Sequence, residues 1–334
     1  MSAPNAIRAF ALLYAHFHRV PLDDGDMKQD QAFVVSKAIK LVQGMMQIAI
    51  ARQWLVPALH SSSLSQFLVQ GMWESQSALL QLPYMDFEII KHCVNGKRAI
   101  RSIADLLDMS EGDRRSLLKG LSDEQYREVI AIAQTFPAPR VDAVSFRVLG
   151  QDQVTPGGLI TCQVRLSLEY AKVGTDADGS ADDDKGKGKE PATKLEDEVE
   201  TFEFDEDGNL MDEPARKLGS SLSAARPVYC PHFANVKRPN WWVSLVNKNH
   251  TNLVATPVKI LDLVDSKTVT LQFPAPPKPL NVSLLLVVRA DAVVGVDVTK
   301  EVKFAVVAPV QQQAPEERWE ISGDEEEGVV FDEE

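Results

Sequence analysis

The hydrophobic residues of this chain change their spacing at one point, Phe136-Pro-Ala-Pro139. Before that point they recur at steps of three and four, the spacing of one face of an α-helix, as in Val35, Ile39, Val42, Met46 and Ile50. After it they alternate with polar residues, which is the spacing of a half-buried β-strand. We therefore expect an α+β chain in which helices come first and strands follow.

The helical part divides into two blocks. Residues 1–95 are predicted to form a helical bundle, in which Ser63 and Gln66 match a capping box in front of FLVQGMW. Residues 96–136 are shorter and more charged, and Ser110 and Ser122 are placed to cap two of their helices. This second block is predicted to be a small helical, helix-loop-helix-like domain.

Seven short alternating runs follow, separated by Gly, Pro, Asn and Asp: 144–150, 159–170, 240–247, 253–264, 268–274, 282–290 and 301–308. Such a series is typical of a β-sandwich, so residues 137–310 are predicted to be a fibronectin-III/Ig-like β-sandwich. Cys162 lies in the second run, but the late LLLVV run contains no cysteine to pair with it. A disulfide-free, fibronectin-type sandwich therefore fits better than a true immunoglobulin domain.

Negative charge is concentrated in two segments. Residues 173–216, here called the insertion, carry sixteen acids and five bases, and residues 316–334 carry ten acids and one base. Because the whole chain has a net charge of −13, everything outside these segments carries +7. We expect the insertion and the tail, residues 311–334, to be disordered, because they cannot bury enough apolar surface to offset the entropy of ordering. Within the insertion, ETFEF alternates like a strand.

No sequence motif points to an enzyme, a metal site or a cofactor. GKGKE lacks the glycine spacing of a phosphate-binding loop, and an EF-hand alignment of DEDGN places Pro214 where the bidentate glutamate is needed. His16 and His18 lie two residues apart, so on a helix they cannot share a metal; we expect one buried and one exposed. Three widely spaced cysteines indicate a reducing compartment, and with no signal peptide and no apolar run of about 18 residues we expect a soluble, cytosolic chain.

Nucleic-acid binding is not expected. The second helical block superficially resembles a helix-hairpin-helix DNA binder, but its turn reads DMSEGD, which is acidic. Phosphate contacts need local positive charge and backbone amides presented by a tight glycine turn.

Two adjacent tryptophans, Trp241 and Trp242, open one of the predicted strands, so their rings point to opposite faces. One is expected to fill the core and the other to face outward or to lie under a loop. Both are candidate partner anchors; the alternative, that both pack within the chain, is favoured by the large apolar area that aromatic residues bury.

Several separated segments together resemble the Sec63 family: His16–Pro21, Gln43–Ala49, Trp54, Leu68–Trp73 and Leu79–Pro83. The resemblance extends over residues 6–310 and implies the same order of helical bundle, small helical domain and fibronectin-like sandwich. The family's domain occurs in the J-domain subunit of the endoplasmic-reticulum translocation complex and in the cassettes of Brr2-like RNA helicases. The stretch CPHFANVKRPNWWVSLVNKN, the charged insertion and the acidic tail resemble the translocon subunit more than a helicase.

The resemblance implies partners rather than a reaction. The sandwich would bind a cytosolic loop of the translocation channel, and the acidic tail would bind the basic N-terminal segment of a smaller translocon subunit. The tail residues expected to make this contact are Asp324, Glu325, Glu326, Glu327, Asp332, Glu333 and Glu334, with Trp319 and Phe331 as possible anchors. Ser322 has acids at +2 and +3, so it is a candidate phosphosite.

The chain lacks the transmembrane helices, the J domain and the His-Pro-Asp triplet of the translocon subunit, so contact with the membrane would come through partners or a missing anchor region. It is expected at the cytosolic face of the endoplasmic reticulum membrane. Two alternatives stay open: a regulatory cassette of an RNA helicase, or an orphan scaffold for another basic partner. A purely solubilising tail is disfavoured by its apolar residues, Trp319, Val329, Val330 and Phe331.

Overall fold

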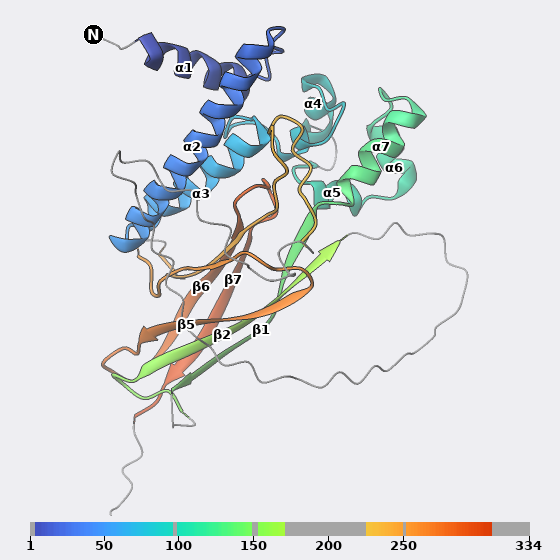
Figure 1. Ribbon diagram of the computed structural model, residues 1–334. Helices are drawn as coiled ribbons and strands as arrows, with labels where there is room; N and C mark the ends of the chain where they lie inside the picture. Colours follow the sequence, from blue (N-terminus) through green and yellow to red (C-terminus); the bar gives the residue numbers. More distant parts are fainter. Residues whose placement is uncertain (1–3, 96–98, 149–152, 171–224, 250–251, 309–334) are drawn as a thin grey trace, which may run out of the picture.

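The computed structural model describes residues 4–95, 99–148, 153–170, 225–249 and 252–308 (Figure 1). Within them the chain is an α+β fold in which helices precede strands, as the change of spacing predicted. The helices are α1 Pro4–Phe17, α2 Gly25–Ala51, α3 Leu55–Gln70, the 3₁₀ helix η1 Ala78–Gln81, α4 Phe87–Asn95, α5 Ile103–Leu107, α6 Glu111–Leu117 and α7 Asp123–Ala133. The strands are β1 Pro137–Val148, β2 Leu159–Tyr170, β3 Trp241–Asn247, β4 Val258–Ile260, β5 Ser266–Pro274, β6 Leu280–Ala290 and β7 Val298–Val306.

Two short helices begin at the serine caps that the sequence predicted. Ser110 accepts a hydrogen bond from the backbone of Asp113 at the start of α6, and Ser122 with Gln125 forms a full capping box at α7. The prediction for Ser63 was wrong. It lies inside α3, where its hydroxyl donates to the Leu59 carbonyl at 3.2 Å, because the apolar run begins eight residues earlier, at Leu55.

Helices α2 and α3 lie side by side as a hairpin joined by a short turn (Figure 1). Four residues of the predicted apolar face of α2 are buried, Val35, Ile39, Val42 and Met46; Ile50 is half-buried, and Ala49 is buried beside it. α3 ends at Gly71, whose φ of 57° is a left-handed conformation that glycine adopts without steric cost.

By length and composition alone, α2 is also the one helix in the described part of the chain that could cross a membrane.

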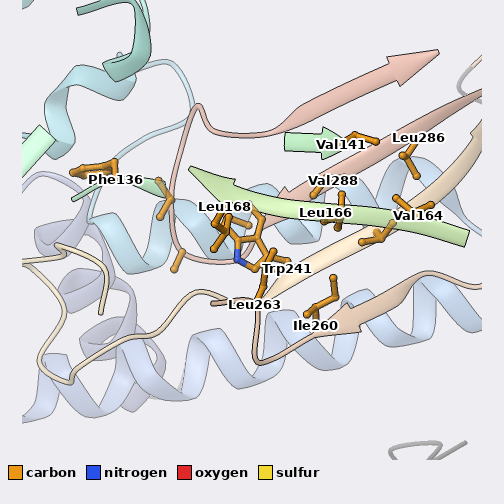
Figure 2. Close-up of a cluster of buried hydrophobic side chains, with 14 of the residues drawn as sticks. Phe136, Val141, Val164, Leu166, Leu168, Trp241, Ile260, Leu263, Leu286 and Val288 are labelled. Carbon is orange, nitrogen blue, oxygen red and sulfur yellow. The ribbon is translucent and has the colours of Figure 1, made fainter. Parts of the chain in front are cut away.

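The strands form two antiparallel sheets, one of order β1-β2-β5 and one of order β4-β3-β6-β7. Buried side chains of both sheets converge between them, with Val164 and Leu166 from one side meeting Trp241, Leu286 and Val288 from the other (Figure 2). All seven predicted strand runs are confirmed as strands. A register shift between Val141 and Ala143 moves the inward positions of β1 from odd to even residue numbers.

Where β3 and β6 pass under α3, the four-stranded sheet is buried on both of its faces. Leu284, Leu286 and Val288 of β6 point into the space between the sheets, whereas Val287 packs with Leu55 of α3 on the other side. This explains why the LLLVV run does not alternate: a strand covered on both faces reads as a continuous apolar run. The outward face of the β1-β2-β5 sheet carries polar residues and lies open to solvent.

Several predictions concern residues outside the described ranges. The proposed ETFEF strand, the whole insertion and the tail lie there. The three predicted parts, 1–95, 96–136 and 137–310, share one contiguous hydrophobic core, which includes Val69 from the bundle, Leu118 from the small helices and Ile160 from the sheets.

Candidate functional site

The tryptophan pair lies at the start of β3, with its rings on opposite faces as predicted. Trp241 is fully buried between the sheets, and its indole N–H has no hydrogen-bond acceptor among the described residues (Figure 2). It is therefore a core residue and has no surface to offer a partner. Trp242 is half-buried and lines a crevice under α2 and α3, together with Met46 and Ser62.

Three buried glutamines join the helices to the segment that follows β6. Gln66 donates to the Ala290 carbonyl at 2.8 Å, Gln70 to the Ala292 carbonyl at 2.7 Å, and Gln81 to the Val294 carbonyl at 2.9 Å. Gln81 also accepts from the Val294 backbone N–H at 2.9 Å. The carbonyls of residues 290, 292 and 294, at and just after the end of β6, are thus paired by side-chain amides, since buried backbone groups need partners.

Charged groups reinforce the same junction. Arg289 of β6 donates to the Leu59 carbonyl at 2.8 Å and to the Ser63 hydroxyl at 3.0 Å, and it pairs with Asp297 at 2.8 Å. Asp291 is buried and pairs with Lys237 at 2.5 Å. Because both carboxylates have a cationic partner, their burial here braces the fold and leaves no uncompensated charge in this cluster.

We did not predict this junction from the sequence. The sequence does contain an indication of it. Gln66 and Gln70 lie four residues apart on one side of an apolar helix, and amide side chains that are buried need hydrogen-bond partners. The sequence could not identify the acceptors, which lie more than 200 residues away.

The AHFHRVPL segment braces the end of α3. Arg19 donates to the carbonyls of Gln70, Gly71 and Leu80 at 2.9–3.0 Å, where the carbonyls at a helix C-terminus attract a cation. His16 is buried and hydrogen-bonds the Leu68 carbonyl at 2.7 Å, and its burial lowers the pKa of the imidazole. His18 is exposed, so the prediction of one buried and one surface histidine is confirmed.

The described residues contain no group of three or more His, Cys, Asp and Glu side chains that could hold a metal ion. Burial raises the pKa of Cys93 to about 11 and that of Cys162 to about 12, so both thiols stay protonated at neutral pH. A thiol in that state is a poor nucleophile.

The outward face of β1-β2-β5 is not covered by any described element. Arg147 and Arg165 project from it, and neither has an ion-pair partner among the described residues. The neighbouring positions are uncharged: Ser145, Thr161, Gln163, Thr270 and Gln272. This face therefore offers two free cations on a polar, rigid surface.

The remaining predicted site residues lie outside the described ranges. They are the tail carboxylates Asp324, Glu325, Glu326, Glu327, Asp332, Glu333 and Glu334, together with Trp319, Phe331 and Ser322. Their roles stay predictions.

Fold and side-chain chemistry together define a rigid α+β module whose buried polar groups brace helices against a sheet. Comparison with known proteins identifies the family. The family model described as the Sec63 Brl domain matches residues 4–303. The chain belongs to the Sec63 Brl domain family, as the resemblance implied.

Two kinds of relative share this domain. The translocation protein SEC63 homologs of mouse and human are each 25% identical and cover 98% of this chain. The Arabidopsis thaliana DExH-box ATP-dependent RNA helicase DExH12 is 28% identical over 90% of the chain, which corresponds to 11% of the helicase. The human U5 small nuclear ribonucleoprotein 200 kDa helicase is 26% identical over 90% of the chain, again 11% of the relative. The chain spans 59% of the length of the SEC63 homologs that it matches.

Proposed function

We propose that this chain is a non-catalytic interaction module of the endoplasmic-reticulum protein translocation machinery, acting at the cytosolic face of the membrane in post-translational import. One observation carries the proposal. The SEC63 homologs match 98% of the chain, whereas the helicases match 90% of it. Nearly the whole chain is therefore accounted for by a relation to translocation proteins.

We infer that the two sheets form a fibronectin-III-type sandwich. The support is the strand order, because β4 pairs with β3 in the four-stranded sheet. In an immunoglobulin constant domain the fourth strand belongs instead to the sheet of the first two strands. Cys162 is a buried free thiol, which fits a sandwich that needs no disulfide between its sheets.

The sandwich, in this proposal, binds the cytosolic loop of the translocation channel through the open face of β1-β2-β5. The outer face of the four-stranded sheet is partly covered, because α3 packs on Val246, Leu285 and Val287. Arg147 and Arg165 are the free cations that a polar or acidic loop would meet. A preformed, rigid surface lowers the entropy cost of such a contact.

The acidic tail, in this proposal, binds the basic N-terminal segment of the smaller translocon subunit. Residues 316–334 carry ten acids and one base, so they attract a polybasic segment at long range. Such attraction is screened over about 8–10 Å at physiological salt. Phosphorylation of Ser322 would add about −1.5 to −2 charges to the same strip.

A pull-down tests both contacts. The purified channel and the smaller subunit are each passed over the intact chain and over a chain cut after Pro315, across a salt series. We expect the intact chain to retain both, and the cut chain to lose the smaller subunit alone, in a salt-sensitive way. If the cut changes nothing, the tail has no docking role. If neither chain retains the channel, the sandwich contact is wrong.

A helicase cassette is the second candidate function, favoured by the helicase relatives that share the domain. Such a cassette would be expected to present a basic helical face to RNA or to the motor. The exposed face of the long helix α2 is instead dominated by apolar residues, with Lys37 and Arg52 as its cations. This composition makes the helicase role the weaker proposal.

A further inference from the structure

Helix α2 exposes a continuous apolar stripe that the fold does not use. Its members follow one another at steps of three and four along a single face: Phe33, Lys37, Leu41, Met45, Ile48 and Arg52. The four apolar members are 62%, 68%, 56% and 61% exposed, respectively. At about 100° per residue this face lies opposite the buried one, so folding does not explain its apolar character.

The charges within the stripe are both positive, and the carboxylate one turn before Phe33, Asp30, pairs with Arg8 of α1. No aspartate or glutamate occurs between Asp30 and Glu74, whereas Lys37 and Arg52 lie in the stripe itself. The ammonium of Lys37 lies 5.4 Å from the centre of the Phe33 ring. Trp54, directly beyond the end of α2, is also exposed. Apolar and aromatic side chains beside lysine and arginine, without acids, are the composition of a helix that lies in a membrane interface.

The shape of the surface favours a flat occupant. The crevices next to α2 are lined by its other face, through Val42 and Met46, and none of the stripe's apolar residues lines them. α2 lies at the periphery of the molecule, on the edge away from the sheets (Figure 1). An exposed helix face without a pocket offers no site for a side-chain anchor, but it can press its apolar side chains between lipid headgroups.

We propose that the α2 stripe is a peripheral contact site for an anionic phospholipid surface. Phe33, Leu41, Met45 and Ile48 enter the headgroup layer, while Lys37 and Arg52 pair with lipid phosphates and carboxylates. The contact is weak and reversible, because few apolar side chains take part and no acyl anchor is involved. It does not rest on the proposed function, since neither the channel nor the smaller subunit is needed for it.

Vesicle flotation tests the site with the intact chain. The vesicles are phosphatidylcholine alone, or phosphatidylcholine with roughly a third phosphatidylserine. Because the residues outside the two acidic segments carry +7, general attraction to anionic vesicles is separated from binding by the stripe with the variants below. We expect the chain to float with the anionic vesicles and to float less with phosphatidylcholine alone.

Matched variants locate the contact. Leu41→Glu with Met45→Glu is expected to weaken binding at least about tenfold, because two apolar side chains are replaced by charges of the wrong sign. Phe87→Glu is the control: Phe87 is 75% exposed on α4, and its replacement should leave binding unchanged. If the double variant does not fold, Lys37→Glu with Arg52→Glu takes its place and should abolish the preference for anionic lipid.

Three results would overturn the proposal. The intact chain could fail to float with either vesicle. The stripe variants could bind as tightly as the intact chain, or no more weakly than Phe87→Glu. Sedimentation equilibrium could reveal a dimer that Leu41→Glu with Met45→Glu converts to a monomer, which would make a second copy of the chain the occupant of the stripe.

Discussion

At the scale of single residues, buried amides carry the contact between helices and sheet. Gln66 is 2% exposed and its side-chain amide donates both to the Ala290 carbonyl and to the Asp297 carboxylate. Without the Gln66 amide, these two acceptors would lose their donor inside the fold. Leaving a buried acceptor unpaired costs more free energy than the hydrogen bond contributes when it is formed. The junction therefore depends on the chemistry of a few side chains as well as on apolar area.

The first prediction concerns this amide. Gln66→Ala is expected to lower the free energy of unfolding by about 2–4 kcal/mol, through two lost hydrogen bonds and a buried, unpaired carbonyl. Urea unfolding measures the change. Gln29→Ala on the exposed side of α2 is the matched control and should change stability by less than about 0.5 kcal/mol. Equal effects of the two substitutions would show that the junction is not held in this way.

A second prediction follows from His16. Burial lowers the pKa of its imidazole below the ordinary value of 6.5, and the Arg19 guanidinium lowers it further. The unfolded chain therefore binds a proton at a pH where the folded chain does not. The difference in pKa therefore lowers the free energy of unfolding in acid. The full stability is present above pH 6.5, and it is lost as the pH falls from 6.5 toward the folded-state pKa of His16.

The variant His16→Gln isolates this effect, because an amide can still donate to the Leu68 carbonyl but does not titrate. Urea midpoints at about pH 7.5 and about pH 5.5 should differ less for the variant than for the unaltered chain. Parallel pH dependence in the two proteins would assign the acid sensitivity to other groups.

At the scale of elements, the coverage of each sheet decides where a partner can bind. α3 packs on Leu285 and Val287 of β6 and so covers part of the outer face of the four-stranded sheet, whereas Thr299 and Glu301 of β7 are exposed. No described element covers the β1-β2-β5 sheet in this way, and alternate residues of β2 leave Gln163 and Arg165 exposed. The free face is therefore a consequence of which sheet the helical hairpin packs on.

The third prediction belongs to this face. Arg147→Glu with Arg165→Glu is expected to weaken capture of the translocation channel at least about tenfold and to leave stability within about 0.5 kcal/mol, because both side chains are exposed. Arg127→Glu makes the same kind of charge change on α7 and should have no effect on capture. Loss of capture with Arg127→Glu as well would point to total charge and not to the sheet.

At the scale of the whole molecule, periodicity was sufficient to predict the order of the parts. The change of spacing at residues 136–139 separates α7 from β1, and every predicted strand run is a strand. These features are local, because each depends on the residues of one segment alone. Ser63 was misplaced because a capping pattern occurs by chance inside a helix that begins earlier.

The long-range contacts could not be predicted in this way. The acceptors of Gln66 and Gln70, the cover on the four-stranded sheet and the burial of Trp241 in preference to Trp242 all depend on how distant segments pack. The exposed stripe of α2 was missed for the same reason. That helix is apolar on both sides, and its sequence does not indicate which side is covered; among the described residues only one side has a neighbour.

The most direct test of the central claim compares two partners on the same immobilised chain. Detergent-purified translocation channel and the motor region of a DExH-box RNA helicase are applied separately at matched concentration and salt. The account predicts that the channel is retained and that the motor is not. Retention of the motor without the channel would contradict it and would make this member of the Sec63 Brl domain family a helicase cassette.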